Sequence, residues 1–477
     1  MEGAIFNGLV KQDDRGKVLA DLATEVPTIG NGGISRDGKT LTYHLRHGVT
    51  WQDGVPLTSD DVVFTYRLYI NPKVNSFYAA YYKHVASITT PDQYTVVVNL
   101  KAPYAAAVIQ LFERGTGGFV VPKHILENST DINTDPFGKH PVGTGPFRLD
   151  RWDHGSLIVL KPNPHYFGGA PKLREIDVHI VVNPNTQMAM VGSHELDVAE
   201  YLTPAQYSQL KTIAGIHAIL VPTLLERFLT FNLKRDPFTD PRVRRALALA
   251  LDRDRIVETA YLGTATVAQT LIPPTSWAYD PTGAPTYDVA RAKSLLDHAG
   301  WVVGPDGMRA KSGRPLSFSL LNQTEQNTLS AMAQEIQRAW RDIGVAADIK
   351  TVPRNVLYGP EGVANNGKFD MIVDDWGADP DPDRSIMTDT KNFSPHGWND
   401  AFYSNPDVDS WSAQAISTFD LSTRKRLYSL IQRQMNRDLP FIPLAWDGRI
   451  YAVNTDLHGF SPEPIYTDFW NVESWQI

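Results

Sequence analysis

The residues best suited to chemistry lie in one segment rich in aspartate, FDMIVDDWGADPDPD, which occupies positions 369–383. Prolines separate its last three acids, Asp379, Asp381 and Asp383. Because proline fixes φ and stiffens the chain, these carboxylates have little conformational entropy left to lose on binding. A rigid carboxylate beside a large ring, here that of Trp376, suits a cationic group held by a charge-assisted hydrogen bond. The pattern therefore predicts a site for an ammonium group, with Trp376, Asp379 and Asp381 as candidate contacts.

Two other interpretations of this segment stay open. Its D-x-D-x-D spacing also occurs in calcium-binding loops, but the glycine and the distal glutamate of an EF-hand are missing. Alternatively, the three acids are solvated loop residues and Trp376 belongs to a core. The residues alone do not choose between an ammonium site and this structural role.

The rest of the sequence offers no recognisable catalytic or metal-binding motif. There is no cysteine, which excludes disulfides, thiol catalysis, thiolate zinc sites and iron–sulfur clusters. The 13 histidines form no H-E-x-x-H pattern, and no serine stands in a G-x-S-x-G setting. The Gly-Thr-Gly turn at 143–145 is not a P-loop, because no Lys-Ser or Lys-Thr follows it. We therefore expect a protein that is not an enzyme and that holds no cofactor or resident metal.

Hydrophobic periodicity identifies the elements that must position the acidic segment. Residues 369–373 predict a buried strand that leads into it. Amphipathic helices are expected at 326–343 and 424–438, and a strand is expected at 345–352. An Asp-Pro pair at 240–241 predicts the start of a further helix. This mixture of strands and helices is typical of α/β domains.

The stretch LTYHLRHGVTWQDGVPLTSDDVVFTY, residues 41–66, predicts a strand, a turn and a helix in succession. Apolar and polar side chains alternate from Leu41 to Arg46, as in a strand with one buried face. Gly54 can adopt the positive φ that a tight turn requires. Thr58 can cap the following helix, whose first turn carries acids that the N-terminus favours.

Length and composition fit an ordinary globular protein of two or three domains. The chain has 477 residues, 42% of them hydrophobic and 21% charged. A net charge of −8 and the lack of a basic run argue against a nucleic-acid surface. No apolar run is long enough to span a bilayer, and the first ten residues, MEGAIFNGLV, do not resemble a signal peptide.

Five sequence blocks, spread over nearly the whole chain, resemble blocks of one known family. Besides residues 41–66 they are VGTGPF at 142–147, FNL with PFTDPRVRRAL between 231 and 247, DVARAKSLLDHAGW at 288–301 and YSNPDVD at 403–409. Their residues and their order are similar to those of the family 5 extracellular solute-binding proteins. That family includes the dipeptide-, oligopeptide- and nickel-binding receptors of ABC importers. On this basis the chain is identified as a member of the family.

The resemblance implies an α/β fold of the periplasmic-binding-protein type II kind, with two large lobes, a hinge and an inserted extra domain. Domain I would be discontinuous, domain II would be the insertion, and domain III would be the second large lobe. The expected ranges are 1–9, 143–233 and 455–477 for domain I, 10–142 for domain II and 234–454 for domain III.

The hinge is expected where strands cross between the lobes, near residues 229–232 and 446–454. Compared with the family, the chain looks as though it starts late. Its Gly8-Leu9-Val10 matches a segment that follows the first strand in family members. We therefore expect the first strand and the export signal of the family to be missing from this chain.

The resemblance also implies a role for Trp376 and Asp379. In peptide-binding family members, a Trp-x-x-Asp at this place clamps the N-terminus of the ligand. Two departures weaken the match. Many peptide binders have an aromatic residue where this chain has Pro380, and some have an arginine where it has Val373. A peptide carboxylate would therefore need another cation.

Other aromatic residues are candidate contacts for a cargo. Phe228 and Phe231 lie on the expected crossing strand, and Trp398 follows Pro-His-Gly in a loop. Tyr81, in the run FYAAYYKHV, would present its ring from domain II. A hinge or core role is an equal alternative for the two phenylalanines.

The function implied is that of an extracytoplasmic substrate-binding protein, in the periplasm or at the cell surface. It would capture a short peptide by lobe closure and deliver it to the membrane permease of an ABC importer. It would act as a monomer, and whether a lipid tethers it stays open. The alternative cargoes within the family are an oligosaccharide, an opine or a metal chelate. A hydrolase using the same cleft is a weaker hypothesis, because the sequence supplies no nucleophile and base.

Overall fold

The computed structural model describes residues 2–115, 118–359, 361–465 and 468–477. The chain forms two compact units, which are described here one at a time. Unit 1 comprises Met1–Val221, Ile416–Phe419 and Ile450–Ile477, and unit 2 comprises Pro222–Ala415 and Asp420–Arg449. The division into three domains stays a prediction.

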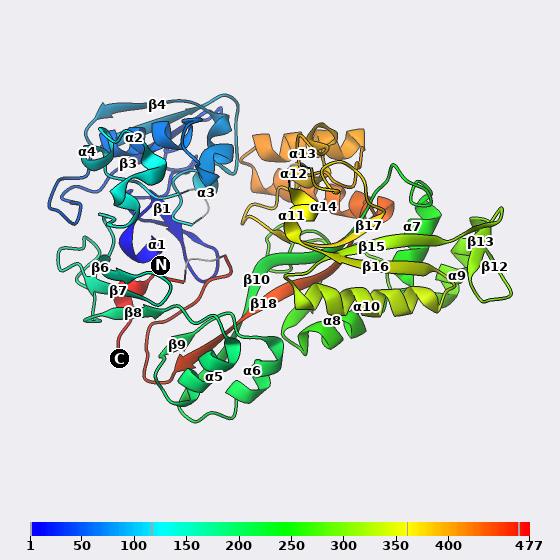
Figure 1. Ribbon diagram of the computed structural model, residues 1–477. Coiled ribbons are helices and arrows are strands. Elements are labelled where there is room, and N and C mark those ends of the chain that lie inside the picture. The colour runs from blue at the N-terminus through cyan, green and yellow to red at the C-terminus, as the bar shows by residue number, and fades with distance from the viewer. Residues whose placement is uncertain (1, 116–117, 360, 466–467) are drawn as a thin grey trace. The chain divides into compact units, whose positions relative to one another are not determined.

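Unit 1 is built from small antiparallel sheets and short helices (Figure 1). One three-stranded sheet has the order β3-β5-β4, a second has the order β6-β7-β8, and β1 pairs with β2. Its strands are β1 (Val10–Gln12), β2 (Val18–Ala20), β3 (Thr40–His44), β4 (Val85–Asp92), β5 (Thr95–Leu100), β6 (Phe147–Asp153), β7 (Leu157–Pro162), β8 (Ile176–His179) and β9 (Val198–Ala199). Its helices include α1 (Glu2–Ile5), α2 (Ser59–Tyr69), α3 (Ala107–Gln110), α4 (Lys123–Leu126), α5 (Pro184–Gly192) and α6 (Pro204–Leu210).

The strand, turn and helix predicted for residues 41–66 are confirmed. β3 alternates buried and more exposed residues, and Gly54 has φ +89°. Thr58 caps α2 in a capping box: the carboxylate of Asp61 accepts a hydrogen bond from the Thr58 backbone N–H at 2.9 Å. This reciprocal arrangement satisfies donors that the first helical turn would otherwise leave unpaired.

Unit 2 is organised around one sheet. Its strands have the order β11-β18-β10-β17-β15-β16, and the long strands β10 (Ile216–Phe231) and β18 (Phe441–Asn454) also supply residues to unit 1. The pairs β15·β16 and β15·β17 are parallel, whereas β10 and β17 pair antiparallel. The other strands of this sheet in unit 2 are β11 (Ala265–Val267), β15 (Ser317–Gln323), β16 (Ala346–Val352) and β17 (Met371–Gly377). A separate three-stranded sheet has the order β12-β13-β14, with β12 (Val302–Val303), β13 (Arg309–Lys311) and β14 (Arg314–Pro315).

Helices lie on both sides of this sheet. Figure 1 shows α8 and α10 along one side, and α12, α13 and α14 on the other. The buried stripe of α10, which includes Leu329, Ile336 and Trp340, packs into the main core of unit 2. The helices are α7 (Pro241–Leu249), α8 (Arg253–Tyr261), α9 (Val289–His298), α10 (Asn327–Arg341), α11 (Arg354–Tyr358), α12 (Ser385–Thr388), α13 (Pro406–Ser417) and α14 (Leu421–Asp438).

Most helix and strand predictions for unit 2 are confirmed, and one is wrong in extent. α10, β16 and α14 lie where periodicity places them, and Asp240 caps α7 through the Arg242 backbone N–H at 2.9 Å. The strand predicted at 369–373 instead runs from Met371 to Gly377. It continues through two aspartates because pairing with β10 satisfies their backbone groups, and the buried Arg227 pairs with the Asp375 carboxylate.

None of the helices in the described part of the chain combines the length and the apolarity that a bilayer crossing requires.

Candidate ligand-binding site

The end of β17 brings the tryptophan of the acidic segment to one face of the unit 2 sheet. The register with β10 sets Trp376 opposite Glu226 and Asp374 opposite Phe228. Because side chains alternate between the faces of a strand, Asp374 and Trp376 point to the same side.

A small cavity of about 20 Å³ lies on this side, within unit 2. Three residues predicted from the sequence line it, namely Trp376, Trp398 and Phe228. The other lining residues come from β10, β17, α11, β18 and the segments that follow β17: Thr230, Arg354, Tyr358, Asp374, Asp375, Met387, Asp400 and Phe441.

The two tryptophans form an aromatic wall of this cavity. Their ring centroids are 5.5 Å apart with an angle of 65° between the planes, and Trp398 is 42% exposed. Phe228 is buried and meets Phe441 edge to face at 5.5 Å. Electron-rich ring faces of this kind attract cations and stack on planar groups.

Two buried carboxyl groups, those of Asp374 and Asp400, face the aromatic wall. Burial, together with the negative charge of Asp375, raises the pKa of Asp374 to about 7. Burial raises the pKa of Asp400 to about 6. A hydrogen bond donated by the Ser394 hydroxyl lowers this pKa and so offsets part of the rise. Within the described ranges, neither carboxylate has a Lys, Arg or His nitrogen within 4.0 Å.

Asp375, by contrast, is neutralised. Arg227 of β10 lies 3.2 Å from one of its oxygens, and Arg354 of α11 lies 3.3 Å from the other. Gln323 and Gln326 each donate a hydrogen bond to this carboxylate at 2.9 Å. Since these partners come from several elements, they hold the Asp375 carboxylate in place.

Two of the three acids in the proline-rich loop form bonds that hold the loop itself in place. Asp381 is 3% exposed and accepts hydrogen bonds from Arg424 of α14 at 2.7 and 2.9 Å. Asp383 accepts the backbone N–H of Ser385 at 3.0 Å and its hydroxyl at 2.9 Å. The Asp381 carboxylate, a candidate contact in the sequence, therefore holds the loop against α14.

Asp379 lies at the start of this loop and is half-buried. Ala378, just before it, still donates a hydrogen bond to the Leu224 carbonyl of β10 at 2.8 Å. Asp379 therefore follows directly on the sheet, near Trp376. Burial lowers the pKa of the Arg384 guanidinium, and the charges of Glu226 and Asp379 oppose that effect.

The structure does not bring the remaining candidates to the cavity. Phe231 has no exposed surface and packs against Phe238 at 5.2 Å, in the main core of unit 2. Tyr81 belongs to unit 1, where it is half-buried against the core of that unit. Among the described residues, no group of three or more Asp, Glu or His side chains is placed to hold a metal ion.

One further acid of β10, Glu226, is completely buried. Neither of its carboxyl oxygens has a hydrogen-bond partner in the ranges that the structure describes. Burial raises the pKa of Glu226 to about 8, and the charge of Arg384 opposes the shift. At neutral pH this side chain is therefore largely protonated.

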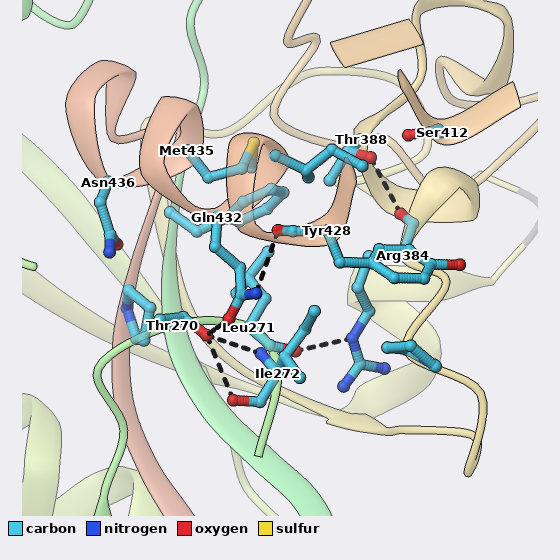
Figure 2. A pocket seen from close by; sticks show the side chains of 14 residues that line it. Thr270, Leu271, Ile272, Arg384, Thr388, Ser412, Tyr428, Gln432, Met435 and Asn436 are labelled. Atoms are coloured by element: carbon cyan, nitrogen blue, oxygen red, sulfur yellow. Dashed lines mark hydrogen bonds between the residues drawn. The ribbon is translucent and has the colours of Figure 1, made fainter. Parts of the chain in front are cut away.

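A second small cavity in unit 2, of about 20 Å³, is lined by α14 and the segments that pack on it (Figure 2). Polar groups that line this cavity form hydrogen bonds with one another. Thr270 donates to Gln432 at 2.8 Å, and Arg384 donates to the Leu271 carbonyl at 2.7 Å. Its other walls are largely apolar, including Met435. This cavity therefore offers a ligand less charge than the one beside Trp376.

Sequence reasoning assigned no role to several residues of the first cavity. Asp374 had a visible signal, because polarity rises sharply where the strand leaves its apolar run. Arg354, Tyr358 and Asp400 had none, since each reaches the cavity from a segment remote in sequence.

The comparisons with known proteins now decide the family. The sequence model of "Bacterial extracellular solute-binding proteins, family 5 Middle" matches residues 17–395. The chain belongs to this family. It is 32% identical over 438 residues to the glutathione-binding protein GsiB of Salmonella typhimurium, in an alignment that covers 90% of this chain and 81% of GsiB.

Solved structures agree with this assignment. NikZ of Campylobacter jejuni, in complex with Ni(L-His), is 27% identical, with a TM-score of 0.83 over 100% of this chain and 94% of NikZ. AppA of Bacillus subtilis, in complex with a nonapeptide, is 26% identical, with a TM-score of 0.80 over 100% of this chain and 93% of AppA. The predicted family and the type II periplasmic-binding-protein fold are confirmed. This solute-binding protein is thus of the ABC-transporter type, and its relatives are not enzymes.

Proposed function

We propose that this solute-binding protein captures a short peptide and delivers it to the permease of an ABC importer. One observation carries the proposal: the strand β17 ends at an aromatic cavity and leads directly into Asp379. AppA, whose structure holds a nonapeptide, and the glutathione-binding protein GsiB support a peptide-like cargo.

In the proposed complex, Asp379 accepts hydrogen bonds from the α-ammonium group of the peptide. Charge-assisted bonds of this kind are about twice as strong as neutral ones. We assign this role to Asp379 because Asp381 is bound to Arg424 and Asp383 accepts the backbone N–H of Ser385. The rigid loop keeps the carboxylate in place, so little entropy is lost on binding.

Trp376 and Trp398 would contact the first residues of the peptide, while backbone groups of neighbouring strands pair with its main chain. Main-chain pairing tolerates different side chains, as in strand addition. Closure of the two lobes would then exclude water, which strengthens each polar contact because the effective dielectric constant falls.

Calorimetric titration of refolded protein, freed of any co-purified ligand, with representative cargoes tests this proposal. The panel contains a tripeptide mixture, reduced glutathione, an oligosaccharide mixture and the nickel–histidine chelate. We expect saturable binding of peptides without their hydrolysis. Binding of the sugar or of the chelate alone would refute a peptide cargo, and peptide turnover would refute a pure binding function.

A further inference from the structure

Two side chains on the same side of the unit 2 sheet as Trp376 bury polar atoms that have no partner. Glu226 shares this face with Trp376, because directly opposed residues of paired strands point to the same side. Glu226 has no exposed surface, and within the described residues neither of its carboxyl oxygens takes part in a hydrogen bond. The indole N–H of Trp446, on β18, is buried and without a partner in the same way. Unpaired buried groups of this kind are rare in folded proteins, so their presence calls for an explanation.

The guanidinium of Arg384 adjoins these two groups and also has nitrogens to spare. The side chain is 5% exposed, and its Nε donates a hydrogen bond to the Leu271 carbonyl at 2.7 Å. Figure 2 shows its two terminal nitrogens turned away from α14, and neither donates a hydrogen bond to any residue that the structure describes. The Arg384 Cζ lies 5.8 Å from the centre of the Trp446 ring.

Arg384 and Glu226 are close without being paired. The charge of each acts on the other, yet among the described residues no carboxylate oxygen lies within 4.0 Å of a guanidinium nitrogen of Arg384. A group placed between them would therefore enter without breaking a hydrogen bond or an ion pair of either residue. We call Glu226, Arg384 and Trp446 the buried donor cluster.

The chemistry of the buried donor cluster selects an anion. The guanidinium of Arg384 is positively charged, and its planar fork of N–H donors matches the two oxygens of a carboxylate. The indole of Trp446 can only donate. Burial raises the pKa of Glu226 to about 8, so at neutral pH its carboxyl group is protonated and can donate as well. A cation at this place would meet the positive charge of Arg384 and gain few acceptors.

The cluster adjoins the residue proposed to hold the ammonium group of the cargo. Arg384 follows Asp379 in the same short loop, and the charge of Asp379 acts on its guanidinium. The other two acids of the loop do not occupy Arg384, because Asp381 is bound to Arg424 and Asp383 accepts the backbone N–H of the next helix. An extended dipeptide carries its ammonium and carboxylate groups about 7 Å apart. An acid and a free guanidinium in one loop suit the two ends of such a short peptide.

We propose that Arg384, Trp446 and Glu226 form the subsite for the carboxylate group of the cargo. The inference rests on the proposed function and supplies the cation that a peptide carboxylate requires. The guanidinium would hold the carboxylate through two parallel N–H···O bonds, and the Trp446 N–H and the Glu226 carboxyl would donate to its remaining lone pairs. Binding would thereby give partners to buried polar atoms whose isolation is costly.

Calorimetry with dialanine and trialanine, each as the free acid and as the C-terminal amide, tests the subsite. The two forms share the ammonium group and differ only in the carboxylate. The free acid of at least one of these peptides should bind the wild type roughly ten-fold tighter or more than its amide. Equal affinities of acid and amide would overturn the subsite and leave the proposed function standing. Absence of binding by both peptides in every form would overturn the two together.

Variants separate a cargo contact from a purely structural role of the cluster. Arg384→Gln should bring the affinity ratio of acid to amide close to one, mainly by weakening the acid. Trp446→Phe removes one N–H donor and should lower the ratio roughly five-fold, which keeps the test open should Arg384→Gln not fold. Arg338→Gln removes an exposed positive charge from α10 and should keep the ratio of the wild type. A ratio that stays unchanged in the cluster variants would overturn the assignment, since ordered water would then be the partner of these groups.

Discussion

The completely buried carboxyl of Glu226 predicts an unusual pH dependence of stability. Its pKa is about 8 in the folded chain, against a reference value of 4.5. Between these two values the folded protein binds a proton that the unfolded chain does not, so stability falls as pH rises. Glu226→Gln removes the titration while keeping the shape of the protonated side chain. The variant should therefore gain stability relative to the wild type as the pH is raised.

The size of this gain follows from linkage. Where only the unfolded state titrates, each pH unit changes the free energy of unfolding by about 1.4 kcal/mol. From pH 5 to pH 7, the advantage of Glu226→Gln should grow by about 2–3 kcal/mol, or about 2–3 °C in Tm for a chain of 477 residues. The loss from burying an uncharged amide does not depend on pH, so it cancels in this difference.

Scanning calorimetry of both proteins at pH 5 and pH 7 measures the effect. Glu258→Gln, which removes an exposed carboxylate from α8, is the matched control. Its Tm relative to the wild type should be almost the same at pH 5 and at pH 7. A Tm difference between Glu226→Gln and the wild type that is the same at both pH values would refute the reasoning. It would mean that Glu226 is already ionised at pH 5, with Arg384 or water as its partner.

Two further substitutions test the framework around the site. Asp381→Asn leaves the buried Arg424 without its anion and should destabilise the protein by about 3–5 kcal/mol in urea unfolding. The surface change Asp348→Asn should leave the urea midpoint nearly unchanged, and equal effects of the two would contradict a structural role for Asp381. Asp240→Ala removes the cap of α7 and should lower stability by about 1 kcal/mol, whereas Asp240→Asn should retain most of it. An Asp240→Asn variant as unstable as Asp240→Ala would show that the cap hydrogen bond is not what matters.

The sequence predicted the elements whose signals are local. The cap of α2, the Asp-Pro start of α7 and the buried stripe of α10 each depend on residues within a few positions of one another. Such patterns can be read without knowing what the element packs against.

The candidate site was predictable only in part. Which side chains reach the cavity depends on their burial and on their partners, and these come from segments remote in sequence. Trp376 and Trp398 were identified by residue type, and the structure places both at one cavity. The partner of Asp381 is Arg424, on a helix remote in sequence, so its structural bond had no local signal. For the same reason the sequence did not show that Asp400 would face Asp374.

In the proposed function, this solute-binding protein holds a peptide by its N-terminal ammonium group at Asp379. The most direct measurement is calorimetry of one tripeptide in its free and N-acetylated forms, with the wild type and Asp379→Ala. Acetylation of the peptide and Asp379→Ala should each weaken binding by about 1.5–3 kcal/mol, and acetylation should have little further effect in the variant. Equal affinity of the wild type for both forms of the peptide would contradict it.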